Sequence, residues 1–263
     1  MKKRLSLCAV ICFSLVMMSF MRQPTPIKVY MIGDSTMSLY DIHQFPINGW
    51  GMPFANYFDD GVMIVNKAKP GRSTRTFLAE NRWKPIADSL KSGDYVLIQF
   101  GHNDEGDSIK YKDRFTPVSD YKTNLIKFIT ETKNKNANPI LITPVSRRNF
   151  DKDGKAKETH IAYTRAVFEI ADQYKVPVID LDKRSRELIQ QLGPEQSKLL
   201  FMQLDSAEHP NYPVGRLDNT HFNEYGARKI AEQVLNELKK QNNPLAAHIV
   251  AGTNQSNVAP AAK

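Results

Sequence analysis

Cysteine is scarce in this chain of 263 residues, and the two cysteines, Cys8 and Cys12, both lie near the N-terminus. From residue 23 onward the sequence contains no cysteine, which excludes disulfides and thiol chemistry from that part. Long hydrophobic runs are lacking as well. The apolar stretch from Leu5 to Phe20 is interrupted by three serines and is shorter than the roughly 20 apolar residues needed to cross a membrane.

The N-terminal stretch has the pattern of a secretory signal peptide covering residues 1–22. Its apolar part follows a short basic segment, Lys2, Lys3 and Arg4. We therefore expect a secreted or periplasmic protein, with no stable membrane insertion once the signal peptide is removed. No Ala-x-Ala motif marks the cleavage point. A lipoprotein signal is the alternative, but neither cysteine follows a small-residue triplet at the end of the apolar stretch.

Basic residues outnumber acidic ones, with 36 Lys and Arg against 28 Asp and Glu and a net charge of +8. Residues 1–22 hold four of the basic side chains, so the rest of the chain carries 32 − 28 = +4. Because this excess is modest, we expect no nucleic-acid binding. Residues 23–241 suffice for one domain with a buried core, which we expect to be a monomer. Residues 242–263 are rich in Ala, Asn, Gln and Ser without periodicity, which predicts a flexible tail.

Short apolar runs alternate with helical patterns along most of the chain. Five runs are continuously apolar, which is typical of parallel strands buried on both faces. They cover Ile27–Ile32, Val62–Val65, Tyr95–Phe100, Pro139–Ile142 and Val176–Leu181. This order predicts an α/β fold, a three-layer doubly wound sandwich with a five-stranded parallel sheet of the flavodoxin-like kind. Ligands bind such sheets beyond the carboxyl ends of the strands, so the loops after the strands are the place to look for a site.

The loop after the first run contains Gly33-Asp34-Ser35-Thr36. Gly33 allows a tight exit from the strand, and Ser35 then begins the turn toward a helix. A serine at this position has its hydroxyl at the mouth of the sheet, where a base can reach it. The alternative is that Ser35 or Asp34 only caps the next helix.

Two further loops offer hydrogen-bond donors. Gly71 can present its backbone N–H to a developing negative charge, or it can simply permit a turn with positive φ. Asn103, in the sequence Gly101-His102-Asn103-Asp104, can donate a side-chain N–H to the same charge. Its alternative role is that of a turn residue bonded to its own backbone.

His102 and Asp104 invite comparison with two-metal phosphoesterases, which use Asp-x-His, then Gly-Asp-x-x-Asp, then Gly-Asn-His-Asp. Here Met37 stands where the second motif needs its last Asp, no Asp-x-His precedes Gly33, and the third motif is transposed to His-Asn. A thioether cannot ligate a hard cation as a carboxylate does. We therefore expect no metal site.

Near the C-terminus, Asp218-Asn219-Thr220-His221 precedes a helix for which Asn223 is the expected N-cap. These residues are predicted to lie on the loop leading into that helix. There, Asp218 can accept a hydrogen bond from one imidazole nitrogen of His221 while the other nitrogen faces a serine. A chance pairing of an acid and a histidine on a surface loop is the alternative.

In order and position, the four loops resemble the sequence blocks of the SGNH (GDSL-type) hydrolases, and the wording around Gly71 and over residues 218–227 is similar to the rhamnogalacturonan acetylesterase group. The resemblance spans most of the chain after residue 26. It implies that Ser35 is the nucleophile, His221 the general base and then acid, and Asp218 the residue that orients His221. It also implies an oxyanion hole made of the Ser35 and Gly71 backbone N–H groups and the Asn103 side chain, with no cofactor.

The resemblance implies a secreted serine carbohydrate esterase that removes O-acetyl groups from pectin-type polysaccharide through an acetyl-serine intermediate. One alternative is an esterase for other acyl esters, such as acetylated xylan or a lipid ester. Others are an acetyl-transferring enzyme and a sugar-binding relative that has lost catalysis.

The candidate substrate contacts are Arg72, Trp50 and His102. Four arginines near the strand ends would suit a polyuronate: Arg72, Arg75, Arg147 and Arg148. The simpler alternative is that they are solvated surface residues. Trp50 and Tyr40 could form a face on which a sugar stacks, with core packing as the alternative for at least one of them.

Overall fold

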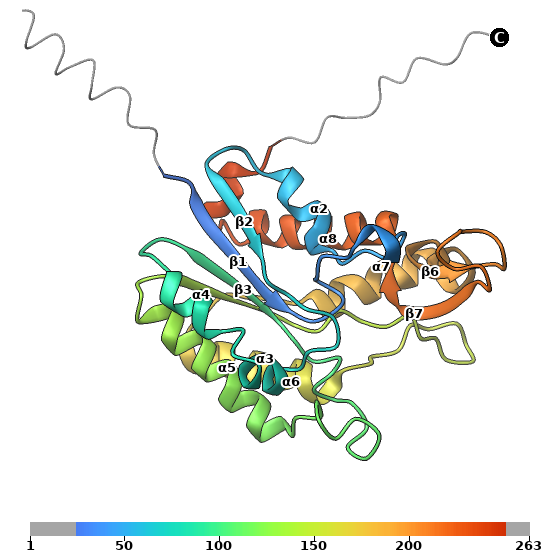
Figure 1. Cartoon of the computed structure of the whole chain (residues 1–263), viewed down its shortest axis with the longest axis horizontal. Helices are drawn as coiled ribbons and strands as arrows, with labels where there is room; N and C mark the ends of the chain where they lie inside the picture. The colour runs from blue at the N-terminus through green and yellow to red at the C-terminus, as the bar shows by residue number, and fades with distance from the viewer. Residues whose placement is uncertain (1–24, 251–263) are drawn as a thin grey trace, which may run out of the picture.

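The computed structural model describes residues 25–250 of the chain (Figure 1). The segment predicted to be a signal peptide, residues 1–22, lies outside the described residues, as do residues 251–263 of the predicted tail. In the part of the chain that is described, no helix has the length and apolar character that a membrane span requires.

A five-stranded parallel sheet forms the middle layer, with the strand order β2-β1-β3-β4-β5. Its strands are β1 (Ile27–Gly33), β2 (Val62–Asn66), β3 (Tyr95–Gln99), β4 (Asn138–Ile142) and β5 (Val178–Ile179). The predicted α/β fold with a five-stranded parallel sheet is confirmed. Four strands match their predicted runs to within one residue, whereas β5 is shorter than predicted. The strand order reverses beside β1, so the loops after β1 and β3 flank the crevice where such folds bind ligands.

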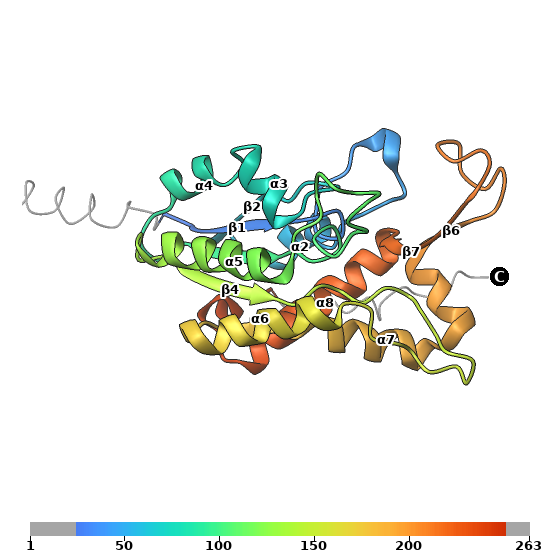
Figure 2. The same cartoon turned by 90° about the horizontal axis from the view of Figure 1, so that it is seen from below.

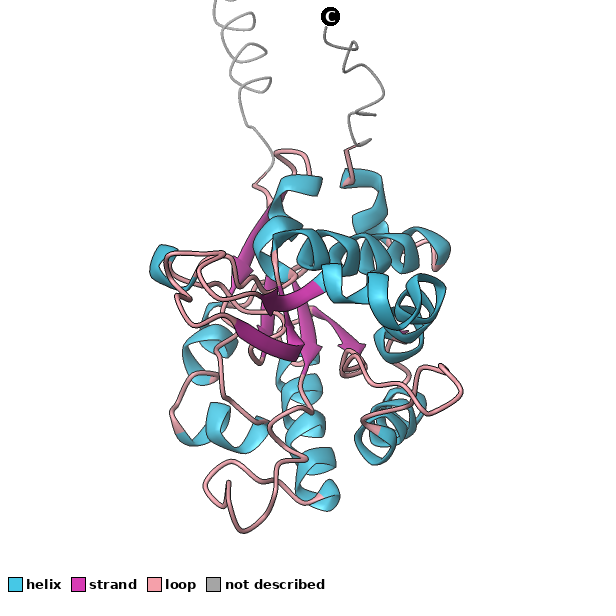
Figure 3. Cartoon of the chain, turned by 90° about the vertical axis from the view of Figure 1, so that its right-hand side faces the viewer, coloured by secondary structure: helices cyan, strands magenta, loops and turns pink. Residues whose placement is uncertain are grey.

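Side chains that alternate along the strands supply two separate hydrophobic cores, one on each face of the sheet. On β1, Val29 and Met31 belong to one core and Tyr30 and Ile32 to the other. Helices cover both faces, which gives the three layers seen in Figures 2 and 3. One face carries α2 (Gly51–Phe54), α7 (Leu181–Gln196) and α8 (Glu224–Lys240); the other carries α3 (Thr74–Ala79), α4 (Lys84–Ser89), α5 (Val118–Lys133) and α6 (Ile161–Tyr174). Short 3-10 turns complete the domain: η1 (Ile42–Gln44), η2 (Ala55–Tyr57), η3 (Ser197–Leu200) and η4 (Pro244–His248).

The last long helix, α8, begins where the sequence predicts. The side chain of Asn223 accepts a hydrogen bond from the backbone N–H of Gly226 at 2.9 Å, which confirms it as the N-cap. A Cβ atom on Gly226 would lie 1.9 Å from the carbonyl oxygen of Leu200, so only glycine lets the first turn pack this closely on η3. This packing places the residues just before α8 against the main domain.

A two-stranded antiparallel ribbon, β6 (Phe201–Leu204) with β7 (Arg216–Phe222), was not predicted from the sequence. Figure 2 shows the ribbon and its connecting loop projecting from one end of the domain. The prediction that Asp218 to His221 lie on a loop is therefore wrong, because both residues belong to β7. The long polar connection between the two strands and the largely polar sequence of β7 conceal the strand pattern in the sequence.

The predicted start of the flexible tail at residue 242 is also too early. Leu245 in η4 is fully buried in the core, and the backbone N–H of Val250 donates to the Tyr57 carbonyl at 3.0 Å. His248 contacts the loop before β2, since its carbonyl accepts from the Asp59 N–H at 2.9 Å. The packed domain therefore continues at least to residue 250.

Candidate active site

The structure brings Ser35, His221 and Asp218 together although 186 positions separate the serine from the histidine. His221 Nε2 lies 3.0 Å from the Ser35 Oγ, and His221 Nδ1 lies 2.7 Å from an Asp218 carboxylate oxygen. A neutral imidazole that donates its Nδ1–H to Asp218 has an unprotonated Nε2 facing the serine hydroxyl. The arrangement can therefore take a proton from Ser35 as its oxygen attacks a carbonyl carbon.

A bulge in the ribbon orients the side chains of Asp218 and His221. Gln203 pairs with Leu217 and Phe201 with Phe222, so Met202 alone stands opposite the four residues 218–221. The extra residues of β7 leave the ladder, as in β-bulges that redirect side chains toward active sites. They bring Asp218 and His221 to the same side, facing the end of β1.

Both oxygens of the Asp218 carboxylate accept hydrogen bonds from neighbouring residues. One oxygen accepts the backbone N–H groups of Thr220 and His221 at 2.8 and 2.9 Å. The other accepts from His221 Nδ1 and from the Arg216 guanidinium, whose Nη2 lies 2.7 Å away. Burial alone would raise the pKa of Asp218, but the bonds and charge of His221 and the bond from Arg216 outweigh it and hold the pKa well below its usual range. Asp218 is therefore ionised and fixed in orientation.

The loop that carries Ser35 is anchored by a chain of buried side-chain bonds. Trp50 Nε1 donates to the Gln99 side chain at 2.6 Å, Gln99 donates to the Thr36 hydroxyl at 2.8 Å, and that hydroxyl donates to Asp34 at 2.8 Å. Trp50 is fully buried, so it cannot stack on a sugar and the prediction of a substrate contact is wrong for this residue. Its indole instead fixes the turn on which Ser35 stands.

Tyr40, the other aromatic residue considered for sugar stacking, binds the same turn. Its hydroxyl donates to the carbonyl oxygen of Ser35 at 2.9 Å. Burial raises the pKa of the Tyr40 phenol, the charge of Asp34 raises it further, and the hydroxyl therefore stays protonated as a donor. The side chain is half-buried and helps to position the serine.

Two backbone N–H groups beside the Ser35 hydroxyl are free to bind an anion. Among the described residues, neither the Ser35 N–H nor the Gly71 N–H has a hydrogen-bond partner. Gly71 has a φ of +79°, and a Cβ there would meet only Arg114 Nη1 at an ordinary contact distance of 3.9 Å, so the left-handed backbone itself accounts for glycine there. Asn103 donates one side-chain N–H to the Arg72 carbonyl at 3.1 Å, which leaves its second N–H for a ligand. These are the donors that the sequence predicts for an oxyanion hole.

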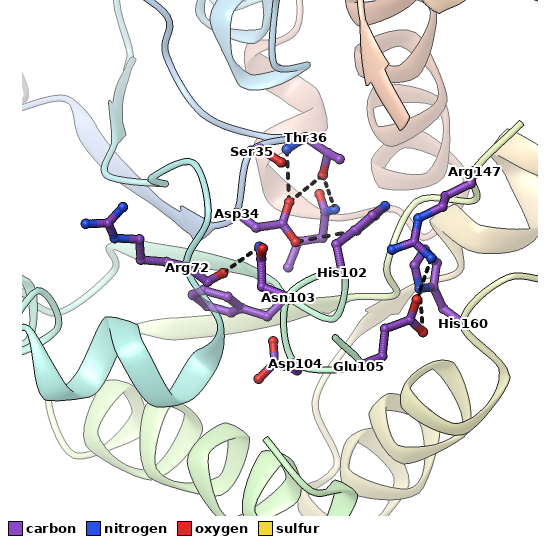
Figure 4. A network of polar contacts seen from close by, with 12 residues as sticks. Asp34, Ser35, Thr36, Arg72, His102, Asn103, Asp104, Glu105, Arg147 and His160 are labelled. Carbon is purple, nitrogen blue, oxygen red and sulfur yellow. Dashed lines mark hydrogen bonds and ion pairs between the residues drawn. The ribbon is translucent and has the colours of Figure 1, made fainter. Parts of the chain in front are cut away.

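A network of buried polar residues lies behind the serine (Figure 4). Asp34, fully buried, has its second carboxylate oxygen 3.4 Å from His102 Nδ1, and the His102 ring packs on His160 with 4.2 Å between ring centroids. His160 Nδ1 in turn lies 2.9 Å from Glu105, which pairs with Arg147 at 2.5 Å. The network runs from the serine loop to an arginine at the rim of the site, and sequence motifs alone do not reveal it.

Burial and neighbouring polar groups determine the protonation states of the residues in this network. Burial and the neighbouring His160 lower the pKa of His102 to about 4, so its ring is neutral at pH 7. Burial would raise the pKa of Asp34, but His102 and the two bonds from Thr36 outweigh it, and the pKa is lowered. His102 supports Asp34 and also lines the cavity around Ser35, with a side chain that is 4% exposed, so it remains a candidate substrate contact.

One cavity of about 590 Å³ unites the predicted residues, since Ser35, Gly71, Asn103 and His221 all line it. Its size suits a sugar unit or a short oligosaccharide. Five charged or aromatic side chains add to the lining, and of these only Arg147 was considered from the sequence: Glu105, Asp107, Tyr111, Arg114 and Arg147. Tyr111 and Arg114 lie on a long loop with no motif to mark them.

The other predicted arginines do not reach the cavity. Arg72 pairs with Glu80 at 3.0 Å, and its guanidinium points away from Ser35 in Figure 4. Arg75 binds the Phe115 carbonyl at 3.2 Å, and Arg148 binds Ser197 and Asn219. Within the described part of the chain, no cluster of three or more His, Cys, Asp or Glu side chains has the arrangement of a metal site.

Comparison with known proteins finds relatives over most of the chain. The chain is 41% identical over 234 residues, 89% of its length and 98% of the relative's, to rhamnogalacturonan acetylesterase RhgT of Bacillus subtilis. It is 31% identical over 223 residues, 84% of its length and 97% of the relative's, to YesY of the same organism, named a probable rhamnogalacturonan acetylesterase. The crystal structure of Bacillus subtilis protein YxiM superimposes with a TM-score of 0.71 at 27% identity, over 84% of this chain and 58% of that one. The model of the GDSL-like Lipase/Acylhydrolase family matches residues 31–229, and the chain belongs to this family of SGNH hydrolases.

Proposed function

We propose that this protein is a secreted serine carbohydrate esterase that removes O-acetyl groups from pectin-type polysaccharide. The observation that carries the proposal is the hydrogen-bonded series Ser35–His221–Asp218, with distances of 3.0 and 2.7 Å, at a cavity lined by free N–H donors. The two relatives that match nearly over their whole length are named as rhamnogalacturonan acetylesterases, which supports the choice of substrate.

In the acylation step, Ser35 Oγ bonds to the acetyl carbonyl carbon while its proton moves to His221 Nε2. Asp218 keeps the Nδ1–H of His221 in place and stabilises the imidazolium that forms. The carbonyl oxygen becomes negative and accepts hydrogen bonds from the backbone N–H groups of Ser35 and Gly71 and from the Asn103 amide. The bond to the sugar oxygen then breaks, and that oxygen takes the proton from His221 as the sugar leaves.

In the second step, water replaces the sugar. His221 Nε2 takes a proton from the water as its oxygen attacks the carbonyl carbon of acetyl-Ser35, and the same donors hold the new oxyanion. The bond to Ser35 Oγ breaks, and the serine regains a proton from His221. The products are acetate and free enzyme, so the cycle needs no oxidant, reductant or cofactor.

The character of the cavity favours a carbohydrate ester over a lipid ester. Four charged side chains line it, Glu105, Asp107, Arg114 and Arg147. A long acyl chain would have to be desolvated against these groups, at a cost that an apolar groove would avoid. An acetyl group is small enough to fit among them while the sugar lies on the polar rim.

The proposal is tested by acetate release from acetylated rhamnogalacturonan, acetylated homogalacturonan and acetylated xylan. We expect the first to be the best substrate, and Ser35→Ala to reduce kcat by on the order of 10⁴–10⁶-fold. Ser119→Ala, which changes an exposed serine of α5 outside the cavity, is the matched control. Activity retained by Ser35→Ala would overturn the serine mechanism. Equal rates on the three polysaccharides would overturn the pectin preference and leave the esterase.

A further inference from the structure

Arg114 is an unpaired arginine in the active-site cavity. Among the arginines that the structure describes, only Arg114 and Arg165 have side chains without a hydrogen-bond or carboxylate partner. Arg165 is exposed on α6, where water can satisfy it. Arg114 is half-buried, and its Nε is buried with no partner. A guanidinium kept without a partner in a cavity is expected to meet one in a ligand.

The position of Arg114 is fixed by the loop that carries it. Its guanidinium carbon lies 3.9 Å from the centroid of the Tyr111 ring, a cation–π contact that holds the planar group in place. Its Nη1 lies 3.9 Å from where a Cβ of Gly71 would stand, which places it beside the free N–H donors. Both Arg114 and Tyr111 line the cavity with Ser35. The charge is therefore preorganised next to the reacting ester.

The other charges of the cavity have partners within the protein. Arg147 pairs with Glu105 at 2.5 Å, and Glu105 also binds His160 at 2.9 Å. Asp107 accepts the backbone N–H groups of Ile109 and Lys110 at 2.9 and 2.7 Å, as the cap of a turn. Among the side chains that line the cavity, Arg114 is the cation whose charge no carboxylate of the described residues neutralises.

We infer that Arg114 binds the carboxylate of the uronosyl unit that carries the acetyl group. A guanidinium presents two parallel N–H donors that match a carboxylate, and the bond is stronger when both groups are charged. Because Nη1 lies beside Gly71, the acid and the ester must be close to each other, as they are within one acetylated sugar acid. The inference deepens the proposed function and rests on it, since it assigns the substrate class to a specific residue.

The test uses one acetylated galacturonate-containing oligosaccharide in two forms, with free carboxyl groups and with the same groups methyl-esterified. We expect wild-type kcat/KM to be about 10–100-fold higher for the free acid, the value of one charge-assisted pair. Arg114→Gln should abolish this preference, and Arg114→Lys, which keeps the charge but loses the fork, should retain part of it. Arg165→Gln, the matched control, should leave the ratio at the wild-type value. High salt should reduce the wild-type preference.

Three outcomes would overturn the inference. The first is a wild-type enzyme that hydrolyses both forms equally, and the second is an Arg114→Gln variant that is folded, as judged by its thermal unfolding, and keeps the preference. The third is an equal loss on both forms in Arg114→Gln and Arg114→Lys, which would place Arg114 at the oxyanion instead. In each of these cases wild-type acetate release still depends on Ser35, so the proposed function stands. If Ser35→Ala releases acetate like the wild type, the proposed function fails, and the inference fails with it.

Discussion

The two halves of the active site are built in different ways. On the serine half, Asp34 and Thr36 are fully buried and bond to Gln99 and His102, more than 60 positions away in the chain. On the histidine half, the side chains of Asp218 and His221 are 14% and 26% exposed, and the four bonds that hold the Asp218 carboxylate join residues two or three positions apart. The serine is therefore positioned by contacts across the whole fold, whereas Asp218 and His221 are ordered by local contacts within the ribbon.

Substitution of Asp218 should have the largest effect, because it removes the carboxylate that orients His221. Asp218→Asn offers one oxygen to donors that two oxygens satisfy, and the amide favours the wrong His221 tautomer. We expect kcat for acetate release to fall by about 10⁴-fold. Asp205→Asn, an exposed change on the same projecting loop, is the control for the kinetics. A loss below tenfold would contradict the assigned role.

The second prediction compares the halves through stability. His102→Ala leaves a buried Asp34 carboxylate oxygen without its polar neighbour and opens space beside His160, so we expect a loss of about 3 kcal/mol in the free energy of unfolding. Arg216→Gln removes a partly exposed partner of Asp218 on the ribbon and should cost less than about 1 kcal/mol. Urea denaturation with both slope and midpoint fitted measures the two values. Similar costs for the two variants would show that the halves are equally coupled to the fold.

The smallest expected effect is on the pH dependence of stability, through Asp104, the residue that directly follows Asn103. Burial raises the pKa of Asp104 to about 7, against the bonds from Thr74, whereas in the unfolded chain the group ionises near pH 4. Between these values the unfolded chain binds fewer protons than the folded one, so the stability contributed by Asp104 is present at low pH and lost as pH rises. From pH 5 to pH 7 the difference in unfolding free energy, wild type minus Asp104→Asn, should fall by about 2–3 kcal/mol. A constant difference would exclude a protonated Asp104.

Much of the fold was predictable because its signals are local. Continuous apolar runs marked the five parallel strands, and Asn223 marked the start of α8. Ser35, Gly71 and Asn103 were predicted from short motifs at the strand ends, and the structure brings them to one cavity together with His221. Strand ends of a parallel sheet converge at one edge, so residues in these loops must meet.

Other features depended on packing that no short pattern encodes. From the sequence, Trp50 could equally form a surface on which a sugar stacks or part of the core. Its complete burial and its hydrogen bond to Gln99 show that it belongs to the core. The arginines show the same ambiguity. Arg72 follows a conspicuous motif but pairs with Glu80, while Arg114 lies in an unremarkable loop and stays unpaired in the cavity.

Local sequence specifies the parallel sheet and the polar residues at its strand ends, because hydrophobic periodicity and short polar motifs act over a few residues. Tertiary packing specifies which charged side chains line the cavity, that Trp50 is buried, and how His221 reaches Ser35. That last contact joins residues 186 positions apart across a bulged ribbon, and its geometry depends on how β6, β7 and α8 pack together. Pairing and burial are properties of the folded chain, so they appear only when distant segments are side by side.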